Sequence, residues 1–220
     1  MSNRLFSHSR RRSTQTARSQ DHAEPVLNDQ PLRGVFVERD SHGAVTRRLT
    51  FGRCGAWSFQ TLDANSHTVT GGYSCQSNQL HTFFKNNNAY SGWRYDYLVT
   101  KSYLLLGVLH AKGEGSSLAG KWVGEWTILS GTDARNLTIA GGGLTSLTLL
   151  ADGTLHRATR VPGRSVSIRS GRWREIGCSG EFVRYRIDLT GQAGGFDLVH
   201  WPASGSLGLW LYERSTQSQW

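Results

Sequence analysis

The stretch Leu118–Leu129, LAGKWVGEWTIL, sets the pattern for the rest of the chain. It opens with Gly120-Lys121-Trp122, and it predicts a strand that is followed by further short alternating strands. A fainter copy of this opening lies 86 residues earlier, where Gly34 and Phe36 take the places of Gly120 and Trp122. We therefore interpret the chain as two related runs of strands.

The segments that follow the two openings also match in order. Leu49-Thr50-Phe51 corresponds to Leu147-Thr148-Leu149, and Gly71-x-Tyr73 corresponds to Gly171-x-Trp173. The offset between matching residues only grows along the chain, and each increase falls in an expected turn. A duplicated meander with longer turns in its second copy predicts this behaviour. The alternative is chance similarity, because all β-meanders share turn glycines and alternation.

Composition supports strands and excludes several classes of site. The chain has 26 Gly, 8 Trp, 7 Tyr and 8 Phe in 220 residues. No apolar run approaches the roughly 20 residues of a membrane-spanning helix, so we expect a soluble protein without a membrane span. Cys54, Cys75 and Cys178 are odd in number and lack metal-ligand spacing. We expect no disulfide scaffold, no metal and no cofactor.

Residues 1–30 are predicted to form a disordered basic tail. The first 20 residues carry five arginines and no acid, and apolar residues are few. A solvated tail on a cytoplasmic protein is the favoured interpretation. A transit peptide, which would place the protein in the mitochondrial matrix, is the alternative. A third interpretation is an arm that contacts nucleic-acid phosphates.

From residue 31 onward, period-two alternation predicts an all-β fold in two units, 31–112 and 118–214. The linker-like stretch Lys112–Ser117 separates them. Short connections favour an antiparallel up-and-down meander. Two small barrels are favoured over one larger closed barrel. Predicted strands are 32–39, 44–51, 56–62, 67–75, 78–85, 93–100 and 103–110, then 120–130, 144–150, 155–161, 166–176, 181–189, 196–201 and 207–213.

Each unit resembles the small bacterial lipocalin-like domain of the calycin group. The shared motifs are the Gly-x-Trp opening, the Leu-Thr-Phe strand, an Asp-Gly turn at Asp152-Gly153, the later Gly-x-Trp/Tyr strand and a Leu-rich last strand. The first unit departs from this pattern at Phe36 and at Cys54-Gly55. The resemblance implies barrels that hold a small molecule. It also implies a basic residue of the last strand over the opening Trp, a role open to Arg214 in the second unit.

Aromatic side chains are the candidate ligand contacts. By parity, Trp93, Tyr95 and Tyr97 share one strand face, and His81 lies in phase with Phe83 on the neighbouring strand. His81, Tyr95 and Tyr97 are therefore candidate catalytic residues in one lumen. The alternative is that they fill the core. The full set of candidate ligand contacts is Trp57, Trp93, Tyr95, Tyr97, Trp126, Trp173 and Tyr185.

Two single histidines and one group of arginines complete the candidates. His156 and His200 have the parity opposite to their apolar neighbours, so we expect both to be solvated. The arginines of two adjacent strands are interpreted either as a basic stripe for phosphates or as a solvated face balanced by Glu175 and Glu181. They are Arg169, Arg172, Arg174, Arg184 and Arg186.

These observations lead to three functional hypotheses. The first is binding of a small apolar or aromatic molecule in a Trp/Tyr/Phe-lined cup. The second is a cofactor-independent cyclase, isomerase or lyase that uses His81, Tyr95 and Tyr97. The third is binding of nucleic acid or another anionic partner through the tail and the arginines. Motifs of nucleophilic hydrolases, kinases and dinucleotide enzymes are absent. Enzymatic activity and a homo-oligomer are left open.

Overall fold

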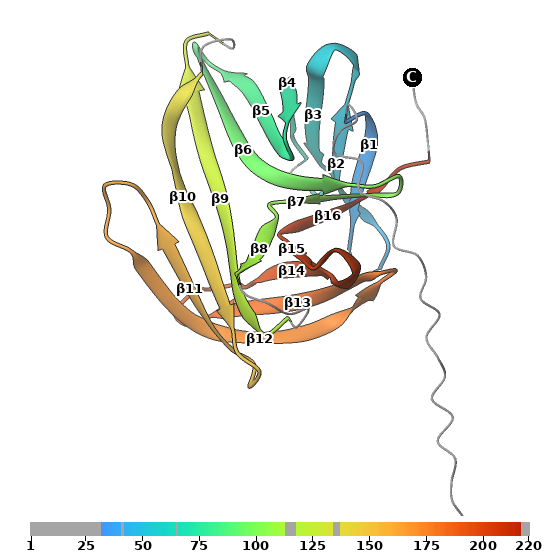
Figure 1. Cartoon of the computed structure of the whole chain (residues 1–220). Coiled ribbons are helices and arrows are strands. Elements are labelled where there is room, and N and C mark those ends of the chain that lie inside the picture. The colour runs from blue at the N-terminus through green and yellow to red at the C-terminus, as the bar shows by residue number, and fades with distance from the viewer. Residues whose placement is uncertain (1–31, 41, 65, 113–117, 134–136, 217–220) are drawn as a thin grey trace, which may run out of the picture.

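The computed structural model describes residues 32–40, 42–64, 66–112, 118–133 and 137–216. The predicted tail, residues 1–30, lies outside them. Across the described residues, sixteen strands form one continuous antiparallel sheet, and the short 3₁₀ turns Arg53–Gly55 and Pro202–Ser204 are the helical elements (Figure 1). The prediction of an all-β antiparallel fold is confirmed. The same residues contain no helix long and apolar enough to cross a membrane.

The sheet closes on itself twice and so forms two eight-stranded rings. Ring A runs β1 (Gly34–Arg39), β2 (Val45–Phe51), β3 (Ala56–Thr61), β4 (Thr68–Gln76), β5 (Gln79–Asn86), β6 (Ala89–Val99), β7 (Tyr103–Leu106) and β16 (Trp210–Arg214). Ring B runs β9 (Gly120–Gly131), β10 (Thr138–Leu149), β11 (Thr154–Arg160), β12 (Ser167–Ser179), β13 (Phe182–Leu189), β14 (Phe196–Trp201), β15 (Ser206–Gly208) and β8 (Leu109–Lys112). Pairing between β6 and β9 joins the rings.

The last strand of each ring comes from the other half of the chain. β7 belongs to ring A, but after Gly107, whose φ is +66°, the chain enters ring B as β8. In the same way, β15 closes onto ring B and β16 crosses to ring A. The two crossing segments run antiparallel in one register, from Tyr103 opposite Glu213 to His110 opposite Ser206. The division into units 31–112 and 118–214 stays a prediction about the sequence.

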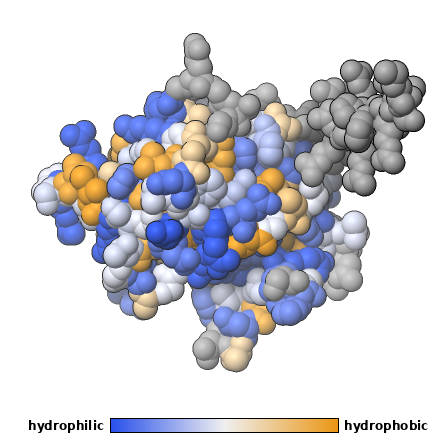
Figure 2. Space-filling view, turned by 90° about the horizontal axis from the view of Figure 1, so that it is seen from below, coloured by the Kyte–Doolittle hydropathy of each residue, from blue (hydrophilic) through white to orange (hydrophobic). Residues whose placement is uncertain are grey.

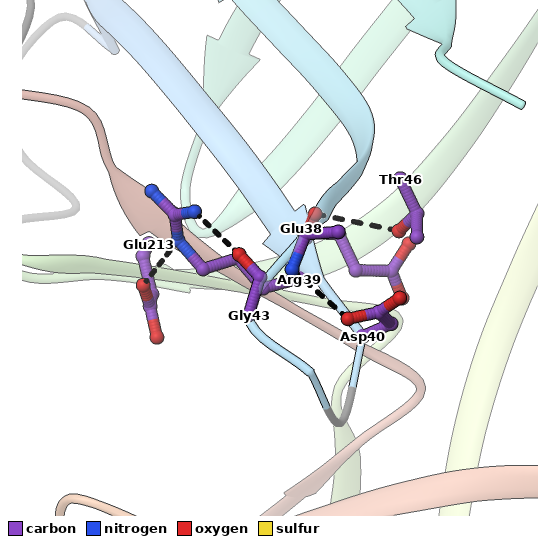
Figure 3. Close-up of polar contacts among 7 residues, drawn as sticks. Glu38, Arg39, Asp40, Gly43, Thr46 and Glu213 are labelled. Carbon is purple, nitrogen blue, oxygen red and sulfur yellow. Dashed lines mark hydrogen bonds and ion pairs between the residues drawn. The ribbon is translucent and has the colours of Figure 1, made fainter.

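Contacts at both ends of β1 hold the exchanged strand β16 in ring A. The Arg214 guanidinium lies 4.6 Å from the centroid of the Phe36 ring and donates to the carbonyls of Arg33 and Lys101, each at 2.6 Å. At the other end, Arg39 Nε lies 3.3 Å from a Glu213 oxygen (Figure 3). Arg214 thus covers the opening aromatic residue of the first unit, and not Trp122 of its own unit, because β16 pairs with β1.

Three clusters of buried side chains stabilise this arrangement. Ring A encloses one cluster, ring B encloses another, and a third lies between the rings. Leu211 and Tyr212 are neighbours in β16, yet Leu211 joins the cluster between the rings and Tyr212 joins the core of ring A. Each fully buried large apolar side chain contributes about 1.5–3 kcal/mol. The exchanged strands are therefore part of the packing as well as of the sheet.

Candidate functional site

The sheet forks where the two rings meet. Residues 90–95 of β6 pair with β9, whereas residues 97–99 pair with β7. On β9, residues 121–123 pair with β8 and residues 126–131 pair with β6. Beyond the fork, β5, β6, β9 and β10 are consecutive neighbours in one sheet that belongs to both rings (Figure 1).

One face of this shared sheet carries a group of five apolar and aromatic side chains, which we call the aromatic strip: Phe84, Trp93, Tyr95, Trp126 and Ile128. Tyr95 stands opposite Trp126 and Trp93 stands opposite Ile128, so these four side chains share a face. The rings of Phe84 and Trp93 lie 5.2 Å apart. Trp93 is 44% exposed and Ile128 is 38% exposed. Three of the predicted ligand contacts, Trp93, Tyr95 and Trp126, are thus brought together.

Glycines on the neighbouring strand give Trp126 its place. Gly143 stands opposite Trp126, and a Cβ at this position would lie 3.1 Å from the indole ring and 2.4 Å from the carbonyl oxygen of Arg160. Residues 138–143 belong to β10, although the predicted strand begins only at residue 144. The run Gly141-Gly142-Gly143 is a strand because the absence of side chains lets neighbouring groups lie against its backbone.

The other predicted ligand contacts lie elsewhere. Trp57 and Tyr97 are 7% and 1% exposed in the core of ring A, and Trp57 donates its indole N–H to the carbonyl of Phe83 at 3.1 Å. Trp173 and Tyr185 pack against each other in ring B, with ring centroids 5.6 Å apart. These four aromatic residues fill the two interiors.

His81 does not share a lumen with Tyr95 and Tyr97. It stands opposite Arg94, whereas Tyr95 stands opposite Leu80, so His81 occupies the other face of β5. The prediction of one shared lumen is wrong, because His81 is an odd number of residues from the inward Leu80, Thr82 and Phe84. Burial lowers the pKa of His81, and Arg94 lowers it further.

Ring A contains a polar cluster whose residues are not among those predicted from the sequence. Arg47 Nη1 donates to a Glu38 carboxylate oxygen at 3.0 Å. The Arg47 guanidinium also interacts with the buried Tyr212 hydroxyl and, against the larger effect of burial, lowers its pKa. Burial raises the pKa of Tyr212, and burial raises the pKa of Tyr95 to about 12. Burial also raises the pKa of Glu38, against the effect of Arg47. The available signal was parity, since Glu38 is in phase with Phe36 and Arg47 with Leu49.

Tyr95 connects the polar cluster to the aromatic strip. It belongs to the strip and packs against the core of ring A that contains Tyr212. Its charged form would repel that of Tyr212, so Tyr95, in addition to burial, contributes to the raised pKa of Tyr212. Thr82 stands opposite Trp93 on the same face and is 2% exposed. Its hydroxyl lies near that of Tyr95 but has no partner in hydrogen-bond geometry. The mouth of ring A therefore combines exposed rings with buried hydrogen-bond donors.

The two single histidines differ from each other. His156 is exposed, and its Nδ1 lies 3.1 Å from Ser170 Oγ, as expected for a solvated residue. His200 is 5% exposed, lies 5.9 Å from the Trp122 ring and has no hydrogen-bond partner at Nε2. The prediction that His200 is solvated is wrong. Its apolar neighbours Val199 and Trp201 pack between the rings, so β14 is buried on both faces.

The arginines of β12 and β13 lie largely on the outside of ring B. Arg186 contacts Asp197 at 3.0 Å and Asp188 at 3.4 Å, and Arg169 donates to Gln192 at 3.1 Å. The partners of Arg186 are therefore aspartates and not Glu175 or Glu181. Seen from below, the molecule shows hydrophilic residues interspersed with apolar groups (Figure 2). Binding of an anionic partner through these arginines stays a prediction.

A further hollow lies on the opposite face of β9. It has a volume of about 560 Å³ and is lined mainly by Lys112, Lys121, Val123, Glu125 and Leu144. It carries none of the predicted ligand contacts.

Within the described part of the chain, no three His, Cys, Asp or Glu side chains are arranged to hold a metal ion. No family model, curated protein or solved structure matches the chain.

Proposed function

We propose that the protein binds a small apolar or aromatic molecule at the aromatic strip, where ring A opens beside β9. The observation that carries this proposal is the exposure of Trp93 and Ile128, side by side with Phe84, Tyr95 and Trp126. A contiguous exposed apolar patch beside buried polar groups is typical of a binding site. The ligand lies at the mouth of the ring, because core side chains fill the interior below.

The likeness to lipocalin-like barrels supports the same function. Ring A is a closed antiparallel ring of eight strands, with an opening aromatic residue covered by a cation from the last strand. Val99 lies in the same buried cluster as Phe36, and Arg214 donates to the carbonyl of Lys101, two residues beyond Val99. Trp93 is six residues from Val99 along β6, which is roughly 20 Å at about 3.3 Å per residue. The aromatic strip therefore lies toward the opposite end of ring A from Phe36 and Arg214.

Fluorescence titration tests this proposal. A naphthalene-type probe should quench tryptophan emission of the full chain with saturable binding. Trp93→Ala and Ile128→Ser should each weaken binding at least tenfold, because they remove the exposed part of the strip. Ile168→Ser is the matched control, since Ile168 is also an exposed strand isoleucine, 70% exposed on β12. Absence of saturable binding, or equal weakening by Ile168→Ser, would refute the proposal.

A cofactor-independent reaction is the second candidate function. It is favoured by the polar cluster beside the strip, in which Glu38 and Tyr212 both have raised pKa values. In this version Glu38 and Tyr95 would move protons, in place of His81 and Tyr97. The test is exchange of acidic C–H protons of a bound ketone with deuterated water, followed by NMR. Exchange that Glu38→Gln leaves unchanged would remove this candidate.

A further inference from the structure

We propose that the ligand of the aromatic strip is an aromatic carboxylate, that its anionic group binds Arg47, and that Glu38 takes up a proton when it binds. This inference rests on the proposed function and specifies the chemical class of its ligand. The relevant observation is the position of a partly exposed charge pair, with side chains 41% (Arg47) and 22% (Glu38) exposed, inside the mouth of ring A.

The side chains of Arg47, Tyr95 and Tyr212 each carry an N–H or O–H that can donate a hydrogen bond, and only the hydroxyls can also accept one. The hydroxyls of Tyr95 and Tyr212 keep their protons at neutral pH, because burial raises the pKa of both. Arg47 has several N–H groups, and only its Nη1 contacts Glu38. The one carboxylate of the cluster, Glu38, already accepts from Arg47. A ligand that brings acceptor oxygens therefore fits this site better than one that brings donors.

The shape of the strip specifies the rest of the ligand. The side chains of Phe84, Trp93 and Trp126 lie on one face of a sheet, and Tyr95 on the same face also packs against the core of ring A, which contains Tyr212. A planar aromatic body stacked on these rings directs a substituent at its edge toward Tyr95 and Arg47. A carboxylate at that edge can accept a bidentate pair of hydrogen bonds from the guanidinium.

Binding of an anion to Arg47 changes the charge balance at Glu38. The charged and titratable groups around Glu38 are Arg47 on β2, Arg184 on β13, Asp197 on β14 and Tyr212 on β16. Burial already raises the pKa of Glu38, while Arg47 and Arg184 oppose that rise. A ligand carboxylate shares Arg47 with Glu38 and adds a second negative charge, so the pKa of Glu38 rises further. The carboxylate of Glu38 then takes one proton from solvent.

Isothermal titration calorimetry of the full chain with two matched probes tests the inference. The probes are 2-naphthoate and the uncharged 2-naphthamide, which share their aromatic body. We expect 2-naphthoate to bind at least tenfold more tightly. Arg47→Gln should remove this preference, whereas Arg48→Gln should keep it, because Arg48 is exposed and points to the other face of β2. Circular dichroism verifies the fold of each variant.

Proton uptake is measured with the same probe in buffers of different ionisation enthalpy at one pH near 6. The observed enthalpy of 2-naphthoate binding should change with the buffer in the direction of proton uptake, and Glu38→Gln should abolish this dependence. Equal binding of the two probes would refute the anionic ligand and leave the proposed function standing. Buffer-independent enthalpy would refute the role of Glu38. Binding of neither probe would contradict the proposed function itself.

Discussion

Rings A and B have the same strand order but carry different residues at corresponding positions. Where ring A has Glu38 opposite Arg47, ring B has Gly124 opposite Thr145. On the closing strands, the register that sets Phe36 opposite Arg214 brings Tyr212 level with Glu38, and the register that sets Trp122 opposite Ala111 brings Leu109 level with Gly124. Leu109 packs directly onto Gly124, because a Cβ at Gly124 would lie 2.3 Å from Leu109 Cδ2. The space that is polar in ring A is filled by a leucine in ring B.

The ends of the rings that hold the opening aromatic residues also differ. Phe36 stands opposite Arg214, whereas Trp122 stands opposite Ala111 and donates its indole N–H to the carbonyl of Leu118 at 3.0 Å. Ring B also buries His200 among aromatic rings. One architecture thus supports an accessible polar cluster at one level of ring A, whereas ring B has Leu109 at the corresponding level and carries its inward charge elsewhere, at Arg157, which lies over the Phe196 ring. The strand order fixes the ring, and a few inward residues decide whether the space inside it is polar or filled by an apolar side chain.

Removal of the exchanged strand should give the largest effect. A chain that ends at Gly208 lacks β16 and with it Leu211 and Tyr212, which are 3% and 4% exposed. At about 1.5–3 kcal/mol for each buried side chain, plus the lost pairing with β1 and β7, the loss should be roughly 5 kcal/mol or more. Urea unfolding measures it. A chain that ends at Thr216 is the control. Equal stability of the two truncations would contradict the role of the exchange.

Substitution of a glycine in ring B should come next. Gly124→Ala places a methyl group against Leu109 and should lower the free energy of unfolding by about 1–3 kcal/mol. Gly120→Ala is the matched control on the same strand, because a Cβ there meets nothing within 4 Å. Thermal unfolding followed by circular dichroism compares the two. A Gly124→Ala variant as stable as Gly120→Ala would contradict the close packing of Leu109 on Gly124.

Loss of the covering cation should make the Phe36 end of ring A resemble the corresponding end of ring B. Arg214→Ala removes two hydrogen bonds to carbonyls and the contact with the Phe36 ring, and it should cost about 1–2 kcal/mol. Arg160→Ala, a change at an exposed arginine of β11, is the control. Denaturant titration decides, and an Arg214→Ala midpoint equal to that of the wild type would be evidence against the contact.

The buried histidine should give the smallest effect, visible as a pH dependence. Burial lowers the pKa of His200 in the folded chain, so the unfolded chain binds more protons below about pH 6.5. The free energy of unfolding should therefore fall as the pH drops below this value. His200→Leu should reduce this slope, and His156→Gln should leave it intact. Denaturant titrations from pH 7.5 to 5 measure it; an unchanged slope in His200→Leu would refute the assignment.

Much of the strand pattern could be predicted from the sequence, because each strand alternates and ends at a turn. The strands at 45–51, 56–61 and 196–201 lie within a residue or so of the predicted ranges. The exchange of β8 and β16 could not be predicted, since alternation specifies which face is buried and not which strand is the neighbour. The burial of His200 could not be predicted for the same reason, because the cluster between the rings buries the second face of β14.

The site was predicted in part. Parity places Trp93 and Tyr95 on one strand face, but their meeting with Trp126 depends on the pairing of β6 with β9, which joins the two halves of the chain. Glu38 and Arg47 were overlooked because charged residues in a strand usually face solvent. Glu38 is two residues from the buried Phe36, and Arg47 is two residues from the buried Leu49. Both charged side chains therefore share the inward face of their strands.

The most direct test of the binding site is the indole N–H region of a ¹H–¹⁵N spectrum, recorded with and without 2-naphthoate and assigned by single Trp→Phe variants. The indole N–H groups of Trp57, Trp122, Trp173 and Trp201 already donate to groups within the protein. We expect the signals of Trp93 and Trp126 to shift with ligand while those four stay in place. Shifts of Trp122 and Trp173, with Trp93 unchanged, would place the ligand in ring B and refute the site at the aromatic strip.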